Sequence, residues 1–307
     1  MRIAIIGALL LCMAWPAQAQ DCHNLTYLTG VPISVSGAPV VPVSINQKPA
    51  QMILDSGSAA IQMTGAWAET MGLHESQSPI QVPDFEIGKL KFGAQLQVSP
   101  LPNIGDVAGL LSLTSLRDYD VDIDFASHRL NFFSPDHCPG LIAYWAPDVM
   151  AVLPLTLNEG HIHIPVTVDG QAMSAVLDTG SLQTFMNKND ALRLFGLNET
   201  SPDVTIAAPT NGDPRLSGTR HHFTTLTFGD VTIKNPQVII LPDQTRSSDP
   251  GTLPEISLGM DVLAKLHLYA AFQERKLYIT PADDNDGKIL RPVMEPDSPQ
   301  HARSVPP

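Results

Sequence analysis

The chain has 307 residues, of which 43% are hydrophobic, and its 31 acidic and 18 basic residues give a formal net charge of −13. This length supports one large hydrophobic core or two smaller ones. The acidic balance disfavours nucleic acid and anionic membrane surfaces as partners. The 27 prolines and 21 glycines favour many turns and short strands over long helices.

The N-terminus has the pattern of a secretory signal peptide over residues 1–19. Arg2 precedes an apolar run over 3–15, and Ala17-Gln18-Ala19 forms a small-x-small cleavage site. The apolar run is shorter than the roughly 20 residues that a membrane-spanning helix needs. We therefore expect secretion across the inner membrane into the periplasm, without stable insertion into the membrane.

Cleavage after Ala19 leaves two cysteines, Cys22 and Cys138. In an oxidising compartment two remaining cysteines most simply pair with each other. The sequence therefore predicts a disulfide that ties the mature N-terminus to the end of the first half of the chain.

The rest of the chain contains an internal repeat. The segment Ile53–Ser58 returns 123 residues later as Val176–Ser181, and upstream of it Val41–Asn46 aligns without a gap with Ile164–Asp169. A repeat of this length predicts two similar structural units. The apolar runs are mostly four to eight residues long with a period of two, which is typical of strands, so we expect an all-β fold.

A second match lies near the end of each half. Residues 109–116 correspond to 256–263, with Ser112 at the place of Gly259, a separation of 147 residues. Because Ser112 is larger than glycine, we expect looser backbone packing there. Each match is followed by two apolar runs expected to be strands: 121–125 with 129–132, and 268–272 with 276–279.

Short helices are predicted at four places, two of which end at a glycine cap: 66–71 before Gly72, 189–195 before Gly196, 115–119, and 261–266. Between the two matches the second copy gains 18 residues, since the separation rises from 123 to 141 at Gly88 and Gly229. The gain lies around 204–223. It predicts a long hairpin in the second half alone, with turn-forming residues that include Thr210, Asn211, Gly212 and Gly218.

These features divide the chain into five parts: a signal peptide (1–19), an N-terminal lobe (20–138), a linker (139–150), a C-terminal lobe with the hairpin (151–282) and a tail (283–307). The tail is acidic and rich in proline, and we expect it to be disordered.

The repeated segment offers one aspartate from each half, Asp55 and Asp178, directly after an apolar strand. An approximate two-fold axis brings equivalent residues face to face. Two carboxylates held close together cannot both ionise, so they share a proton. One then acts as general base towards a water molecule and the other as general acid towards a carbonyl oxygen.

The residues after each aspartate are suited to support it. Gly57 and Gly180 permit a tight turn whose backbone N–H groups point at the carboxylate. The hydroxyls of the next pair are expected to bond across to the opposite half, and those of the last pair to the outer carboxylate oxygens. These pairs are Ser56 with Thr179, and Ser58 with Ser181.

On these residues the chain resembles the tandem, single-chain retropepsin-like aspartic proteases of bacteria. The resemblance rests on residues 54–58, 177–181 and 258–263, with a weaker copy at 111–116. It implies two pseudo-symmetric β-barrel lobes with short helices, a cleft between them and a hairpin flap over it. It also implies an aspartic endopeptidase that acts on peptides or proteins with Asp55 and Asp178 as the catalytic pair, and needs neither metal nor organic cofactor.

Other interpretations remain open. Ser112 and the single hairpin are compatible with a two-lobe peptide-binding module that does little chemistry. The lobes pair either within one chain, giving a monomer, or between two chains; the short linker favours the first. The pairs His161/His163 and His221/His222 lack a cysteine or acidic partner at ligand spacing, so solvent-facing strands are favoured over a metal site. Nothing in the sequence positions a serine triad.

Overall fold

A computed structural model describes residues 23–73, 79–101, 105–140, 150–207, 218–242 and 255–282, and the backbone of 289–290. The predictions for the signal peptide, Cys22, most of the linker and the hairpin residues Thr210, Asn211 and Gly212 lie outside these ranges. Within them, no helix is long and apolar enough to cross a membrane.

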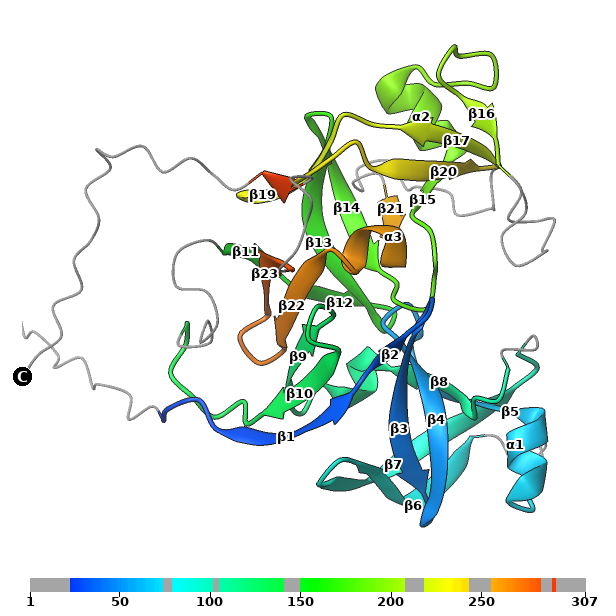
Figure 1. The fold of residues 1–307 in the computed structure, drawn as a ribbon, viewed down its shortest axis with the longest axis vertical. Coiled ribbons are helices and arrows are strands. Elements are labelled where there is room, and N and C mark those ends of the chain that lie inside the picture. The colour runs from blue at the N-terminus through cyan, green and yellow to red at the C-terminus, as the bar shows by residue number, and fades with distance from the viewer. Residues whose placement is uncertain are drawn as a thin grey trace, which may run out of the picture.

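The first half of the chain forms a closed barrel. Its strands are β2 (Ser34–Val35), β3 (Pro39–Ile45), β4 (Lys48–Asp55), β5 (Ile61–Thr64), β6 (Ile80–Ile87), β7 (Leu90–Ser99) and β8 (Gly109–Ser112). The sheet order is β2-β3-β4-β8-β5-β7-β6, and β3 also pairs with β6, which closes a ring of six strands. Helix α1 (Gly65–Thr70) lies on the outside of this barrel, at the lower right of Figure 1.

The second half repeats this plan with additions. Its strands are β12 (Thr156–Asn158), β13 (His161–Val168), β14 (Gln171–Leu177), β15 (Phe185–Asn187), β16 (Thr205–Ile206), β17 (Thr219–His222), β18 (Thr225–Phe228), β19 (Val231–Lys234), β20 (Gln237–Leu241) and β21 (Glu255–Leu258). The order is β16-β17-β20-β15-β21-β14-β13-β18-β19-β24, where β24 is Ile289–Leu290, with β12 beside β13. Asn235, at a φ of 51°, separates β19 from β20, and Pro236 lacks the N–H that a ladder needs.

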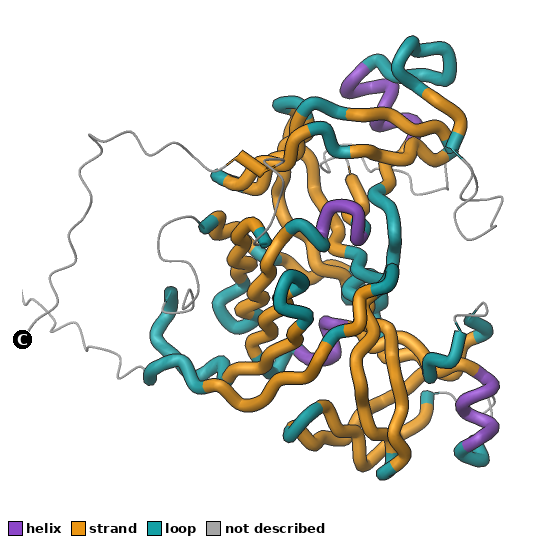
Figure 2. The backbone as a smooth tube through the Cα atoms, viewed as in Figure 1, coloured by secondary structure: helices purple, strands orange, loops and turns teal. Residues whose placement is uncertain are grey.

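A third sheet joins the two halves. Its order is β1 (Tyr27–Pro32), β10 (Arg129–Phe133), β9 (Asp120–Asp124), β22 (Leu266–Ala271), β23 (Lys276–Pro281) and β11 (Ala151–Pro154). Three strands come from each half, and β9 of the first pairs antiparallel with β22 of the second. Figure 1 shows this sheet between the two lobes, and Figure 2 shows how little helix the chain contains. In this structure the halves therefore pair within one chain.

The helices agree with the sequence in position and partly in length. Helix α2 (Lys188–Phe195) ends at Gly196, whose φ of 68° is the left-handed conformation expected of a glycine cap. The 3₁₀ helix η2 (Leu113–Leu116) and helix α3 (Met260–Leu263) both begin before the predicted starts, Ser115 and Asp261.

The expected tail is wrong in one respect. Strand β24 (Ile289–Leu290) pairs antiparallel with β19, so the chain after 282 adds a strand to the edge of the second-half sheet. Two apolar residues are enough for this short ladder. The prediction of disorder was based on the average composition of the whole tail, which did not reveal so short an apolar segment.

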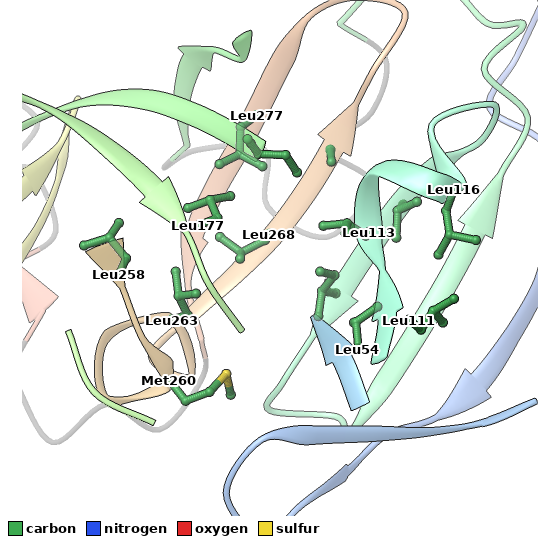
Figure 3. Packing of buried hydrophobic residues seen from close by; sticks show 14 of the residues in the cluster. Leu54, Leu111, Leu113, Leu116, Leu177, Leu258, Met260, Leu263, Leu268 and Leu277 are labelled. Carbon is green, nitrogen blue, oxygen red and sulfur yellow. The ribbon is translucent and has the colours of Figure 1, made fainter. Parts of the chain in front are cut away.

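A hydrophobic core lies behind the strands that carry the aspartates. Leu54 pairs in register with Leu111 in the first half, and Leu177 with Leu258 in the second. All four side chains are buried, and Figure 3 shows them as two similar clusters on either side of the joint between the halves. Burial of each such leucine contributes about 1.5–3 kcal/mol. The core thus anchors the ends of β4 and β14, where the two aspartates stand.

Candidate active site

The turns after β4 and β14 meet at the joint between the halves. A Cβ placed on Gly57 would lie 2.5 Å from Cγ of Asp178, and one placed on Gly180 would lie 2.6 Å from Cγ of Asp55. Each glycine therefore packs directly against the carboxyl group of the opposite half, where no larger residue fits. Each carboxyl group therefore lies against the turn that carries the other aspartate.

Hydroxyl groups cross-link the two turns. The backbone N–H of Ser56 donates to Oγ1 of Thr179 at 3.0 Å, and the N–H of Thr179 donates to Oγ of Ser56 at 3.0 Å. Oγ1 of Thr179 also donates to the carbonyl of Leu54 at 2.6 Å. Both side chains are buried, so these bonds fix the position of one aspartate relative to the other.

The expected role of the next two hydroxyls is wrong. Oγ of Ser58 donates to the carbonyl of Ala60, and Oγ of Ser181 donates to the carbonyl of Gln183, both at 2.8 Å. A carbonyl two residues ahead is within easy reach of a serine in a tight turn, and this local bond takes the hydroxyl proton. The carboxylates instead accept from backbone groups: Gly57 N–H donates to Asp55 at 2.9 Å, and Ser181 N–H to Asp178 at 3.1 Å.

The environment keeps a proton on the pair. Burial, followed by the negative charge of Asp178, raises the pKa of the Asp55 carboxyl to about 7. Burial likewise raises the pKa of Asp178, although the N–H groups of Ser181 and Gly180 act in the opposite direction. At mildly acid pH, Asp55 is therefore protonated, and the pair carries less than its full negative charge.

Ser112 does not loosen the first half, contrary to expectation. Its Oγ donates to the carbonyl of Ser58 at 2.6 Å and lies 2.9 Å from Oγ1 of Thr114, which in turn donates to the carbonyl of Gly160 in the second half at 3.0 Å. A Cβ on the equivalent Gly259 would lie 2.3 Å from the carbonyl oxygen of Gln183. The first half has room for the hydroxyl where the second has none.

Among the residues that the structure describes, the stem of the predicted hairpin is present in the second half alone. Strand β16 pairs antiparallel with β17, and Gly218 lies at the start of the returning arm. A Cβ on Gly218 would lie 2.3 Å from the carbonyl oxygen of Ile240, so glycine lets this arm approach β20 closely. A mainly apolar pocket of about 220 Å³ lies at the base of the hairpin, and Lys188, Ile206, Gly218 and Ile240 contribute to its wall. It lies at the far end of β15 from the aspartates.

Two neighbours of Asp178 were missed as part of the site. Oγ of Ser257 lies 3.5 Å from Oδ2 of Asp178, and the charge of His161 also lowers the pKa of that carboxyl. The repeat contained the signal, because the equivalent positions beside Asp55 hold the apolar residues Leu110 and Ala38. Comparing the positions at which the two copies of the repeat differ, as well as those at which they agree, would have identified both residues.

A comparison of the chain with protein-family models identifies one family. The model of the aspartyl protease family matches residues 41–94 and 164–262, which include both aspartate turns. No curated protein sequence matches the chain.

Among solved structures, the aspartic proteinase from Irpex lacteus is 11% identical with a TM-score of 0.52, and the match covers 84% of this chain and 98% of that one. A retropepsin-like aspartic protease from Rickettsia conorii is 18% identical with a TM-score of 0.32 and covers 42% of this chain and 89% of that one. The first likeness shows that the two-lobe fold is shared.

Proposed function

The chain belongs to the aspartyl protease family as a two-lobe retropepsin-like protein, and on this premise we propose that it is an endopeptidase with Asp55 and Asp178 as its catalytic pair. The observation that carries the proposal is the packing of Gly57 against the Asp178 carboxyl and of Gly180 against the Asp55 carboxyl. The family and the fold support a peptidase. The roles of the individual residues are our inference.

In the proposed reaction a water molecule is held between the two carboxyl groups. The ionised carboxylate removes a proton from the water, whose oxygen forms a bond to the carbonyl carbon of the scissile peptide. The protonated carboxyl donates its proton to the carbonyl oxygen, giving a tetrahedral intermediate. The carboxyl group that took the water proton then donates it to the amide nitrogen, while a hydroxyl of the intermediate returns its proton to the other carboxylate. The carbon–nitrogen bond breaks, and a carboxylic acid and an amine are released. No metal or organic cofactor is assigned to these steps.

The surroundings favour Asp55 as the acid and Asp178 as the base. The pKa of Asp55 is raised to about 7, so it holds its proton at mildly acid pH. Ser257 and His161 favour the charged form of Asp178, whereas Asp55 has apolar residues at the equivalent positions. Because the two groups titrate together, this assignment describes the dominant form of the shared proton.

We further propose that the hairpin of β16 and β17 covers the substrate, with Thr210, Asn211, Gly212 and Gly218 in or near the contact. Only one half carries such a hairpin stem in the described ranges, so substrate binding is asymmetric.

Export to the periplasm and the Cys22–Cys138 disulfide also belong to the proposal. The backbone N–H of Cys138 donates to the carbonyl of His23 at 2.9 Å, which places the residue after Cys22 beside Cys138. Peptide mapping of protein recovered from the periplasm, with and without reduction, tests cleavage after Ala19 and the disulfide together.

The test of the activity is incubation of the purified protein with a diverse peptide library between about pH 4 and pH 7, with products identified by mass spectrometry. Internal cleavage that disappears in both Asp55→Asn and Asp178→Asn, with the fold intact, supports the endopeptidase. Saturable peptide binding without products would replace it by the two-lobe binding module.

A further inference from the structure

The residues that surround the two aspartates differ at positions that are equivalent in the repeat. Strands β13 and β14 pair with His163 opposite Val176, and extending this register by two residues puts His161 opposite Asp178. In the first half, Ala38 is the repeat equivalent of His161 and lies in the bend before β3, outside the β3–β4 ladder that starts with Val40 opposite Ile53. Directly opposed residues of an antiparallel pair share one face, with Cβ atoms about 4.5–5.5 Å apart. Asp178 therefore has a histidine as its neighbour, and the equivalent position in the first half holds an alanine.

The residue before each of these neighbours is a glycine that contacts the opposite half. A Cβ on Gly160 would lie 2.6 Å from Cβ of Ala59, four residues after Asp55. A Cβ on Gly37 would lie 3.3 Å from Cδ2 of Leu182, four residues after Asp178. The two contacts are equivalent in the repeat, so they lie on opposite sides of the aspartate pair.

These contacts define two flanks of the pair. The cationic flank consists of Ala59, Gly160 and His161, and the apolar flank consists of Gly37, Ala38 and Leu182. His161 is half-buried and Ala59 is exposed on the first, while Leu182 is 39% exposed on the second. The charge of His161, which acts on the neighbouring Asp178, also attracts a carboxylate of a substrate, and an exposed leucine attracts apolar side chains.

We propose that His161 is a specificity-determining residue that selects substrates with an acidic side chain on one side of the cleaved bond, while Leu182 selects an apolar side chain on the other. The proposal rests on the endopeptidase function above and adds the substrate class. The backbone around the two aspartates is nearly two-fold symmetric, but the side chains of the two flanks differ. An extended peptide therefore binds in one preferred direction. Burial raises the pKa of Asp178, and the charge of His161 acts in the opposite direction, which agrees with this placement.

The test compares peptide pairs that differ only by Glu or Gln at each position around a bond that the wild-type protein cleaves, at about pH 5. We expect kcat/KM to favour Glu by about 3- to 10-fold on one side of the bond alone, as for a partly exposed charged hydrogen bond. His161→Ala and His161→Gln bring this ratio to about one. Ala38→His, the matched gain at the equivalent position, creates a new preference for Glu on the other side.

His128 provides the control, because it is exposed in a turn at a φ of 55° that asparagine tolerates. His128→Asn leaves the Glu/Gln ratio unchanged. A ratio that persists in both His161 variants, or wild-type protein with no preference for Glu on either side, would overturn the proposal.

The binding of Glu and Gln peptide pairs from the diverse library to Asp55→Asn, measured by calorimetry, separates this proposal from the proposed activity because it needs no cleaved bond. If the wild-type protein cleaves nothing, the endopeptidase fails. If the Glu peptide binds more tightly than the Gln peptide and this difference is lost with His161→Gln in the same background, the proposed role of His161 is still supported. Equal binding of the Glu and Gln peptides, or no binding, would overturn them.

Discussion

Ser56 and Thr179 exchange hydrogen bonds across the two halves, each accepting the backbone N–H of the other at 3.0 Å. The two bonds are buried, and they connect residues that stand directly beside the two aspartates. This reciprocal contact makes the geometry of the carboxyl pair depend on both hydroxyls. It explains how the two halves of the chain hold their aspartate turns against each other.

Removing one hydroxyl is therefore expected to affect both stability and catalysis. Thr179→Ala leaves the N–H of Ser56 without its acceptor and the carbonyl of Leu54 without its donor. Because each unsatisfied buried group costs about 1–3 kcal/mol, we expect the free energy of unfolding to fall by about 2–4 kcal/mol. Thr179→Ser keeps the hydroxyl and is the control. Urea denaturation measures the effect, and equal stability of the Ala and Ser variants would contradict the role of the cross-link.

The positions Ser112 and Gly259 are predicted not to be interchangeable. Ser112→Gly removes the donor to the Ser58 carbonyl and lowers the free energy of unfolding by about 1 kcal/mol or more. Gly259→Ala forces a Cβ against the carbonyl of Gln183 and costs about 1–3 kcal/mol. Thermal melting of both variants checks this. A gain in stability from Ser112→Gly would show that glycine is preferred in both halves.

The raised pKa of Asp55 predicts the basic limb of the activity profile. Above about pH 7 the Asp55 carboxyl loses its proton and no general acid remains. We expect kcat/KM to fall as the pH rises through this value, as measured with one cleaved peptide in buffers of constant ionic strength. Full activity maintained at pH 9 would contradict the assignment of Asp55 as the acid.

The raised pKa of Asp55 also predicts how the stability of the folded protein changes with pH. The folded protein holds the Asp55 proton more tightly than the unfolded chain, so this carboxyl lowers stability progressively as the pH rises from about 4 towards 7. Asp55→Asn removes the ionisation. At pH 7.5 the variant is expected to be more stable than wild type, on the order of 2–4 kcal/mol. At pH 3.5, where both states are protonated, the two proteins should unfold at similar denaturant concentrations.

A buried histidine after β10, beside the sheet that joins the two halves, predicts a second pH effect. Nε2 of His137 lies 2.6 Å from Oδ2 of Asp120, and Tyr269 of the other half donates to the same oxygen at 3.1 Å. Burial acts to lower the pKa of His137, but the bonds to Asp120 and to the Cys138 carbonyl outweigh it and raise the pKa. The contribution to stability is complete below the ordinary histidine pKa of about 6.5 and is lost as the pH rises through the raised value.

His137→Asn is accordingly expected to destabilise the protein more at pH 5.5 than at pH 9. His222→Asn, at an exposed position, is the control. Denaturation curves at the two pH values measure the difference. The same loss of stability at both would show that the histidine contributes by packing and not by its charge.

The architecture could be predicted because it follows from a repeat and from residues that a tight turn demands. Gly57 and Gly180 lie against the opposite carboxyls, and no other residue type fits there. The role of Ser58 was not predictable from residue type alone, since its hydroxyl donates to the nearby carbonyl of Ala60 and not to a carboxylate. The effect of Ser112 depended in the same way on the carbonyl of Ser58, which accepts its hydroxyl proton.

His161 illustrates a different limit. It differs in type from its repeat equivalent Ala38, but this difference indicates a role only once the β13–β14 register, extended by two residues, brings His161 opposite Asp178. The short strand β24 was missed because its partner β19 lies more than fifty residues earlier in the chain. The pairing of strands decides both cases.

The central claim is tested most directly by the kinetics of Asp55→Asn, Asp178→Asn and the double variant on one cleaved peptide. A pair that acts as a unit predicts a loss of at least about a thousandfold in kcat/KM for each single variant, with little further loss in the double variant. Either single variant that keeps more than about a tenth of the wild-type kcat/KM would show that the two carboxyls do not share the reaction.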